Sequence, residues 1–260
     1  MSEPRLRLFR AGPVARITLD RPQIHNAFDE HLIAELTETL QRLGEDATVR
    51  VVVLTGAGKS FSAGADLDWM RRMADYDEEQ NLADARALAL LLQTLDELPK
   101  PTVAMVNGAA LGGGAGLVAA CDIAVAAEAA TFGTTEVRLG LIPAVISPYV
   151  VRAVGPRQAR RWFLTGERMP AAEALRLGLV HEVTAAAELE ARVGRIVDAV
   201  LAGAPEAVTE AKALVRSTQP PTDPDVGPMT ARAIAARRGT PEAREGVRAF
   251  LEKRKPSWIA

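Results

Sequence analysis

Three consecutive glycines separate two apolar segments near the middle of the sequence, within Ala109-Ala110-Leu111-Gly112-Gly113-Gly114-Ala115-Gly116. The segment before them (101–106) is short and β-branched, which predicts a buried strand, and the segment after them (117–121) predicts the first turns of a buried helix. Glycines let the backbone bend sharply and let a ligand approach it closely. The free N–H groups of a helix that starts here would attract an anion, or an oxygen that becomes one during a reaction.

A second glycine-containing loop, Phe61-Ser62-Ala63-Gly64-Ala65-Asp66-Leu67, also follows a predicted strand and precedes a predicted helix. Taken alone, the glycine run is as consistent with tight packing as with ligand binding. Two strand-to-helix loops can meet at the carboxyl edge of a sheet, however, and donate N–H groups to one oxygen. The two loops together therefore favour a ligand site.

Short apolar strands alternate with helical patterns in the first half of the chain. Strands are predicted over 14–19, 49–54 and 123–126, and helices over 29–43 and 82–98. The strand at 49–54 is apolar throughout, which predicts cover on both of its faces. This alternation is typical of an α/β core with parallel strands.

The second half is predicted to be mostly helical. Helical segments are expected over 159–164, 171–177, 187–201, 207–217, 230–237 and 241–253, with one extended segment at 179–183 and a breaker at Gln219–Pro224. We therefore divide the chain into an α/β core, residues 1–200, and a helical C-terminal oligomerisation region, residues 201–260. The tail from Ala207 onward is expected to be too peripheral for one subunit to bury, which predicts an oligomer.

The composition excludes several classes of protein. Apolar residues make up 48% and charged residues 25% of the 260, the balance of a soluble globular protein. The formal net charge of −2 and the 4% of aromatic residues argue against nucleic acid or a membrane surface as partner. No apolar run is long enough to span a membrane, and no secretion signal is recognisable. Cys121, the single cysteine, predicts a reduced packing residue in a cytoplasmic protein, and three scattered histidines predict no metal site.

The ordered motifs of the chain resemble those of the enoyl-CoA hydratase/isomerase (crotonase) family. They are the two glycine-containing loops, Asn107-Gly108, Cys121-Asp122-Ile123, Phe132-Gly133 and Leu141-Ile142-Pro143, and the likeness extends from Asp20-Arg21-Pro22 and Asn26-Ala27 to Phe250–Lys255. The resemblance implies the α/β crotonase (ClpP/crotonase-like) fold, with repeated ββα units and a helical C-terminal trimerisation region. It also implies a homo-oligomer, either a trimer or a hexamer built as a dimer of trimers.

The shared chemistry of that family is the stabilisation of a thioester enolate. The resemblance assigns the oxyanion hole to the backbone N–H groups of Ala65 and Gly113, which need no particular side chain. Coenzyme A is then part of an acyl-CoA substrate, so no separate cofactor is expected. The further residues implied to bind the substrate and its coenzyme A are Ala63, Asp66, Leu67, Gly112, Phe250 and Lys253.

The carboxylates are the main departure from the family pattern. Family hydratases commonly use two glutamates, but here Gly116 stands at the first position and only the second matches, as Glu136. In a dry pocket the pKa of Glu136 is expected to rise, which suits proton transfer near neutral pH. Hydration by a sole carboxylate and Δ3,Δ2-enoyl-CoA isomerisation both remain open. A catalytically reduced scaffold that binds coenzyme A or RNA is the third alternative.

The segment after Glu136 resembles a bacterial branch of hydratases that act on 3-methylglutaconyl-CoA and isohexenylglutaconyl-CoA, in leucine and acyclic-terpene degradation. Val145-Ile146-Ser147-Pro148 replaces a glycine-rich stretch of ordinary fatty-acid hydratases, which predicts bulkier apolar walls. Such substrates carry a second carboxylate that needs a cationic or donor partner. Arg71, Arg72 and Arg138 are candidates by chain position only, and solvent exposure is the expectation for each.

Overall fold

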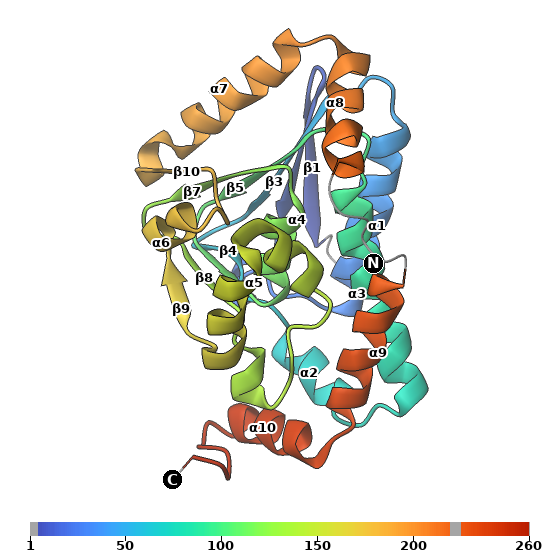
Figure 1. Cartoon of the computed structure of the whole chain (residues 1–260), viewed down its shortest axis with the longest axis vertical. Coiled ribbons are helices and arrows are strands. Elements are labelled where there is room, and N and C mark those ends of the chain that lie inside the picture. Colours follow the sequence, from blue (N-terminus) through green and yellow to red (C-terminus); the bar gives the residue numbers. More distant parts are fainter. Residues whose placement is uncertain (1–4, 219–224, 260) are drawn as a thin grey trace.

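A computed structural model describes residues 5–218 and 225–259 and contains two β-sheets with helices packed around them (Figure 1). The predicted breaker at Gln219–Pro224 lies outside the described residues. The larger sheet has six strands in the order β1-β2-β3-β5-β7-β10, and only its β1–β2 pair is antiparallel. These strands are β1 (Leu6–Ala11), β2 (Val14–Leu19), β3 (Val51–Gly56), β5 (Thr102–Val106), β7 (Ile123–Ala127) and β10 (Glu182–Thr184).

The smaller sheet has four strands in the order β4-β6-β8-β9, of which β8 and β9 are antiparallel and the others parallel. They are β4 (Ser60–Ser62), β6 (Ala109–Leu111), β8 (Thr131–Gly133) and β9 (Arg168–Pro170). Each of β3, β5 and β7 is followed at once by a strand of the smaller sheet and then by a helix. This repetition confirms the predicted ββα units and the crotonase fold.

Strand β3 shows why its sequence is apolar at every position. Val52 and Leu54 belong to the main core, which lies between the sheet and helices that include α1 and α3. Val51 and Val53 point to the opposite face, where they pack with Val193 and other residues of α7. Helix α7 crosses the side of the sheet away from α1 and α3 in Figure 1. The predicted cover on both faces of 49–54 is thus confirmed.

Most helices lie where the apolar spacing predicts them. The α-helices are α1 (Glu30–Glu45), α2 (Leu67–Met73), α3 (Glu78–Asp96), α4 (Gly113–Ala120), α5 (Ser147–Thr165), α6 (Ala171–Arg176), α7 (Leu189–Ala202), α8 (Pro205–Ser217), α9 (Val226–Arg238) and α10 (Pro241–Leu251), and short 3-10 turns are η1 (Pro22–Ile24), η2 (Glu136–Leu139) and η3 (Ala186–Glu188). Helix α5 is longer than the predicted 159–164 because two helical segments meet at Gly155, where φ is +77°. Strands β4, β6, β8 and β9 were not predicted, since strands of three residues show no periodicity. Strand β1 was also not predicted; it lies at the edge of the larger sheet and buries only its first residue.

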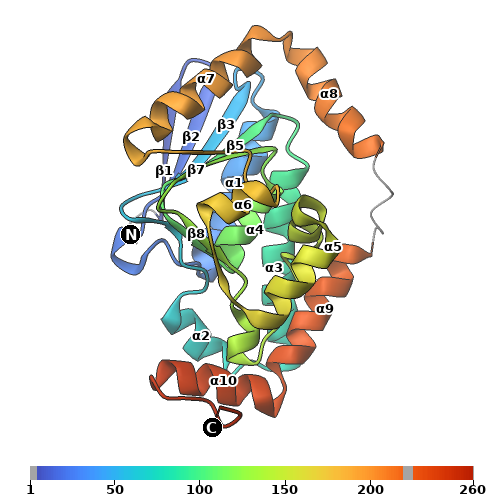
Figure 2. The ribbon, with the colours of Figure 1, turned by 60° about the vertical axis from the view of Figure 1, so that its left-hand side comes forward.

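The C-terminal helices differ in how they pack. Helix α8 buries no residue and is held by polar contacts, with Arg216 pairing with Glu97 just after α3 and Lys212 with Asp122 between α4 and β7. Helices α9 and α10 instead pack on the rest of the same chain, α9 along α3 and α10 against η2 (Figure 2). The expectation that the whole tail is too peripheral for one subunit to bury is therefore wrong for α9 and α10, and holds for α8.

Candidate functional site

The two glycine-containing loops meet, as the sequence predicts. Strands β4 and β6 are parallel neighbours, and the loops that leave their carboxyl ends start α2 and α4. A Cβ on Gly64 would lie 3.0 Å from Leu111 O and 3.9 Å from Gly112 Cα. Both glycines have positive φ, +90° at Gly64 and +51° at Gly112, a conformation that L side chains rarely adopt. This close approach requires glycine on both sides.

The meeting loops leave two backbone N–H groups available to a ligand. Phe28 pairs with the first loop through Phe28 N–H to Gly64 O and Asp66 N–H to Phe28 O, which skips the N–H of Ala65. Gly113 is the first residue of α4, where the N–H groups have no acceptor inside the helix. Ala65 is exposed and Gly113 is partly exposed. Two donors at adjacent, accessible loops are what an oxyanion hole needs.

Phe28 contacts both loops, the first through its backbone and the second through its ring. Its ring lies so close to Gly113 that a Cβ there would come within 2.7 Å of Phe28 Cε2. Phe28 is 2% exposed, so the ring cannot move aside into solvent. A side chain at residue 113 would therefore displace the start of α4 and the N–H that it presents.

Sequence motifs alone did not show that Arg21 and Asn26 position the first loop. The Arg21 guanidinium donates to Asp66 Oδ2 at 2.9 Å and to Ala27 O at 2.8 Å. The Asn26 side chain is fully buried and donates to Ala57 O and Ser60 O. Asp66 also accepts from Asp68 N–H at 2.8 Å and so begins α2. Its carboxylate, predicted to lie near coenzyme A, is thus engaged within the chain.

Glu136 brings an ionisable group to the same place. It follows β8 and opens η2, and a Cβ on Gly112 would lie 3.3 Å from Glu136 Oε1. Glu136 Oε2 is buried and has no hydrogen-bond partner among the described residues. Burial raises the pKa of Glu136 to about 7. A carboxyl group beside the glycine loop that titrates near neutrality can both accept and return a proton.

The position of the first family glutamate, residue 116, is closed. A Cβ on Gly116 would lie 2.4 Å from Ile146 Cγ2 and 3.5 Å from Leu92 Cδ1. Ile146 is 3% exposed and precedes α5 directly. The isoleucine therefore fills the space that a side chain at residue 116 would need, and a carboxylate there is incompatible with Ile146 in place.

The other predicted residues are scattered around these loops. Ala63 is partly exposed and Leu67 is 48% exposed at the start of α2. Phe250 is 49% exposed and Lys253 is exposed just after α10, a helix that packs against α2 and η2. Of the three candidate arginines, Arg71 pairs with Asp68 and Arg72 with Glu30. Arg138 is exposed, and its aliphatic stem packs beside Gly166.

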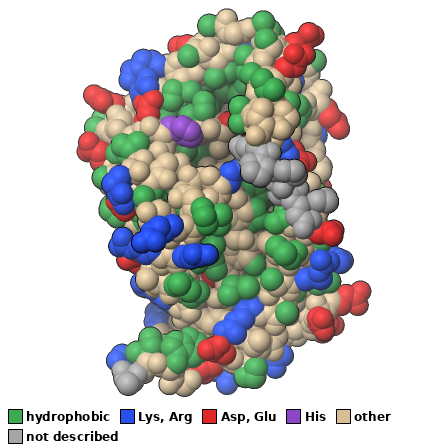
Figure 3. Space-filling model, viewed as in Figure 1, with side chains coloured by type: hydrophobic (Ala, Val, Ile, Leu, Met, Phe, Trp, Pro, Cys, Tyr) green, Lys and Arg blue, Asp and Glu red, His purple; other side chains and the backbone are tan. Residues whose placement is uncertain are grey.

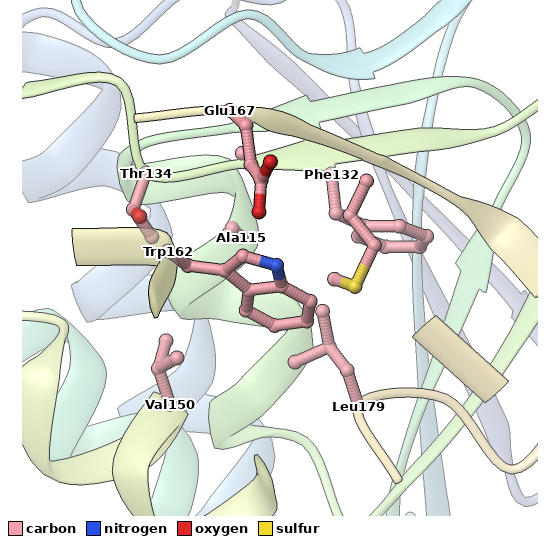
Figure 4. A pocket seen from close by; sticks show the side chains of 9 residues that line it. Ala115, Phe132, Thr134, Val150, Trp162, Glu167 and Leu179 are labelled. Carbon is pink, nitrogen blue, oxygen red and sulfur yellow. The ribbon is translucent and has the colours of Figure 1, made fainter. Parts of the chain in front are cut away.

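A mostly apolar cavity lies on the Ala115 side of α4 (Figure 4). Glu167 points into it toward the indole of Trp162, and buried Thr134 Oγ1 has no hydrogen-bond partner among the described residues. Glu167 forms an ion pair with Arg161. A carboxylate that already has a guanidinium partner is a weak replacement for the one missing at residue 116.

The sequence profile of the family described as enoyl-CoA hydratase/isomerase matches residues 10–260. The chain belongs to this family, the crotonases. It is similar to a crystal structure of an enoyl-CoA hydratase from Shewanella pealeana, with 45% identity, a TM-score of 0.81, and coverage of 98% of this chain and 96% of that one. It is 35% identical to the short-chain-enoyl-CoA hydratase of Clostridium acetobutylicum, over 95% of each chain.

The same crotonase sequence is also similar to a protein that bears the name of another reaction. It is 40% identical to 4-chlorobenzoyl coenzyme A dehalogenase-2 of an Arthrobacter species, over 70% of this chain and 67% of that one. Family membership makes this protein an enzyme of the hydratase/isomerase family. The side chains around the loops must decide which reaction it favours.

Three further properties of the described part of this crotonase concern membrane helices, metal binding and its cysteine. None of its helices is both long and apolar enough to cross a membrane. Within residues 5–218 and 225–259, His, Cys, Asp and Glu nowhere form a group of three or more that could hold a metal ion. Cys121 is buried, and burial raises the pKa of its thiol to about 12, as a packing residue requires.

Proposed function

We propose that this crotonase adds water across the double bond of an enoyl-CoA thioester, with Glu136 as its sole acid/base carboxylate. One observation carries the proposal: the carboxylate of Glu136, whose Oε2 is buried without a hydrogen-bond partner among the described residues, lies against Gly112, next to the available N–H of Gly113. A proton-transfer group and an oxyanion donor on adjacent backbone are the two parts that enolate chemistry needs.

In the proposed reaction the thioester oxygen accepts hydrogen bonds from Ala65 N–H and Gly113 N–H. Charged Glu136 removes a proton from water while the water oxygen attacks C3 of the substrate. The electron pair of the C2–C3 double bond moves toward the thioester, whose oxygen becomes the enolate oxygen. Glu136 then returns its proton to C2, so one O–H bond breaks, a C–O and a C–H bond form, and one water is consumed. The two donors act most strongly when the oxygen carries charge, which is in the transition state.

Isomerisation of a 3-enoyl to a 2-enoyl thioester is the second candidate. The observation that favours it is the filling of the Gly116 side by Ile146, which leaves one carboxylate. In that reaction Glu136 removes a proton from C2 and returns it to C4, and no water is consumed. One base suffices because each step moves one proton.

For the acyl group we propose a branched chain with a distal carboxylate, of the 3-methylglutaconyl-CoA type. Val145 and Ile146 are buried, at 6% and 3% exposed, and Ile146 lies against Gly116 of α4, so bulky apolar side chains stand beside this helix. A methylene-sized difference in such a wall changes the transition-state free energy by about 1–3 kcal/mol. These apolar side chains therefore support a branched acyl group. Preference for an acyl group with a distal carboxylate requires a cation elsewhere in the site.

The test is turnover of crotonyl-CoA, 3-methylglutaconyl-CoA and a 3-enoyl-CoA, with the products identified by mass and chromatography. We expect net addition of water and a higher kcat/KM for 3-methylglutaconyl-CoA than for crotonyl-CoA. Equal or better efficiency on crotonyl-CoA would remove the dicarboxylate assignment and leave a general hydratase. Formation of a 2-enoyl thioester without added water would favour the isomerase.

We also propose that the protein assembles as a trimer or a dimer of trimers. The support comes from α8, on which Leu214 and Val215 are 62% and 58% exposed and no residue is buried. Apolar residues on a helix that its own chain leaves uncovered favour a partner subunit. Light scattering at working concentration checks the assembly, and a monomer there would contradict it.

A further inference from the structure

A second cavity lies between α2, the segment that follows η2, and the C-terminal helices α9 and α10. Apolar side chains line much of it, with Met70 and Met73 from α2, Leu141 from the segment after η2, and Val247 from α10. Two arginines, Arg238 and Arg244, complete the lining. Figures 1 and 2 both show α2 directly beside α10, and the helices are in contact. The cavity is thus an apolar pocket with cations at its wall.

Only one of these two arginines has a carboxylate partner. Arg238 forms a buried ion pair with Asp84 at 2.6 Å, and Asp84 also accepts from Trp69 Nε1. The guanidinium of Arg244 forms no hydrogen bond or ion pair with any residue of the described ranges 5–218 and 225–259. A guanidinium beside an apolar wall that has no carboxylate partner can bind an anionic ligand.

The carboxylates nearest in sequence to Arg244 are already engaged. Glu242 pairs with Arg237, whose guanidinium also donates to Gly140 O, and Glu245 pairs with Arg254. The Arg237 pair links α10 to Gly140, in the segment that follows Glu136. The two pairs also leave Arg244 without competition from its neighbours on the helix, so its partner must come from elsewhere.

The pocket lies close to the reacting groups. Helix α2 begins two residues after Ala65, and Met70 is only about 4.5 Å further along the helix axis than Leu67. Leu141 N–H donates to Glu136 O at 3.0 Å, so the other wall is bonded to the backbone of the acid/base residue. An acyl chain whose thioester oxygen sits between Ala65 and Gly113 can extend along α2 into this cavity.

We propose that Arg244 binds the distal carboxylate of the substrate and selects carboxylated over neutral acyl chains. The inference rests on the proposed function, since it names the cation that a 3-methylglutaconyl-type substrate needs. Arg71 and Arg72, candidates from chain position, already have carboxylate partners. Arg244 was not singled out from the sequence because the opposite wall of the pocket, from α2 and Leu141, is distant along the chain. A planar guanidinium can bind a carboxylate through two parallel hydrogen bonds.

The experiment compares Arg244→Gln with the control Arg248→Gln, an exposed arginine one turn later on α10 that does not line the pocket. Equilibrium binding is measured by calorimetry with glutaryl-CoA and valeryl-CoA, which have the same number of acyl carbons but differ in the distal carboxylate. Arg244→Gln should lower the ratio of the two affinities by about 10- to 100-fold, since a charge-assisted pair is lost. Arg244→Lys should retain part of that ratio, and Arg248→Gln all of it.

A matching steady-state measurement uses 3-methylglutaconyl-CoA and crotonyl-CoA, and Arg244→Gln should raise the KM ratio of the two substrates more than it changes their kcat ratio. Equal loss for both ligands, or weaker inhibition by free coenzyme A, would overturn the proposal and assign Arg244 to coenzyme A phosphates or to structure. An unchanged affinity ratio would also overturn it. Failure of the hydratase proposal is distinguishable, because the wild-type protein would then bind glutaryl-CoA selectively without turning over any enoyl-CoA.

Discussion

Residues 116 and 136 both lie beside Gly112, yet their surroundings treat an ionisable group in opposite ways. At the turn from β8 to η2, Glu136 places a carboxylate against Gly112 with one oxygen buried and unpartnered. Within the first turn of α4, Gly116 carries no side chain, and Ile146 occupies the space beside it. Burial of the Glu136 carboxylate has a desolvation cost, whereas an apolar side chain fills the space beside Gly116.

The contrast supports the proposal that Glu136 alone carries the proton in the reaction. A carboxyl group at its ordinary pKa would be a poor proton donor near pH 7, whereas burial raises the pKa of Glu136 to about 7. The same group can then take a proton in one step and return it in the next. A second carboxylate nearby would raise that pKa further through like-charge repulsion. The apolar filling by Ile146 therefore supports the function of the group that remains.

The largest effect is expected from Glu136→Gln. The amide keeps the shape of the side chain but cannot carry the proton, so kcat should fall by about 10²- to 10⁴-fold while thioester binding persists. Steady-state kinetics and calorimetric binding of an unreactive acyl-CoA measure the two quantities. Glu167→Gln is the control, because that cavity-facing glutamate is paired with Arg161. Near-normal turnover by Glu136→Gln would remove Glu136 from the mechanism.

The pH dependence tests whether the difference in burial matters to the reaction. Glu136 must be charged to remove a proton, so kcat/KM should rise with pH through the pKa of about 7 and level off above it. At pH 5 only about 1% of such a group is charged, which predicts a decrease of about 100-fold relative to the plateau. Initial rates from pH 5 to 8.5 measure the profile. A flat profile over this range would show that this carboxyl group does not limit the free enzyme.

The fold was largely predictable because its main signals are local and periodic. The spacing of Leu32, Leu36 and Leu40 predicts α1, and the structure adds that Asp29 caps it by accepting from Leu32 N–H at 2.7 Å. The four strands of the smaller sheet have three residues each and are defined by their neighbours across the sheet. Local patterns cannot show such pairing, so these strands were missed. They nevertheless position both glycine-containing loops.

The site was predictable where backbone chemistry fixes the residue type. Gly64 and Gly112 are glycines because two loops approach closely at positive φ, and that requirement is visible in the sequence. The contact between Gly116 and Ile146 joins residues thirty positions apart, and the pocket of Arg244 joins α2 to α10. Both depend on tertiary packing. The sequence therefore predicted that the two loops meet, and it could not predict what packs around Gly116 and Arg244.

The smallest effect, and the most direct test of the closed position, comes from Gly116→Glu alone and combined with Ile146→Gly. The single change forces a side chain into Ile146 and buries a carboxylate without a partner, so the free energy of unfolding should fall by about 3 kcal/mol. Chemical denaturation measures it. Gly194→Glu is the matched control, since Gly194 is exposed on α7 with nothing within 4 Å of its Cβ position.

The double variant removes the clash and should recover part of the lost stability, because a remaining cavity and an unpaired charge still destabilise the fold. Neither variant should exceed the wild type in turnover of its own substrate, since the added carboxylate competes with Glu136 for protons. A faster double variant would show that the missing carboxylate limits this enzyme and that Ile146 merely excludes it.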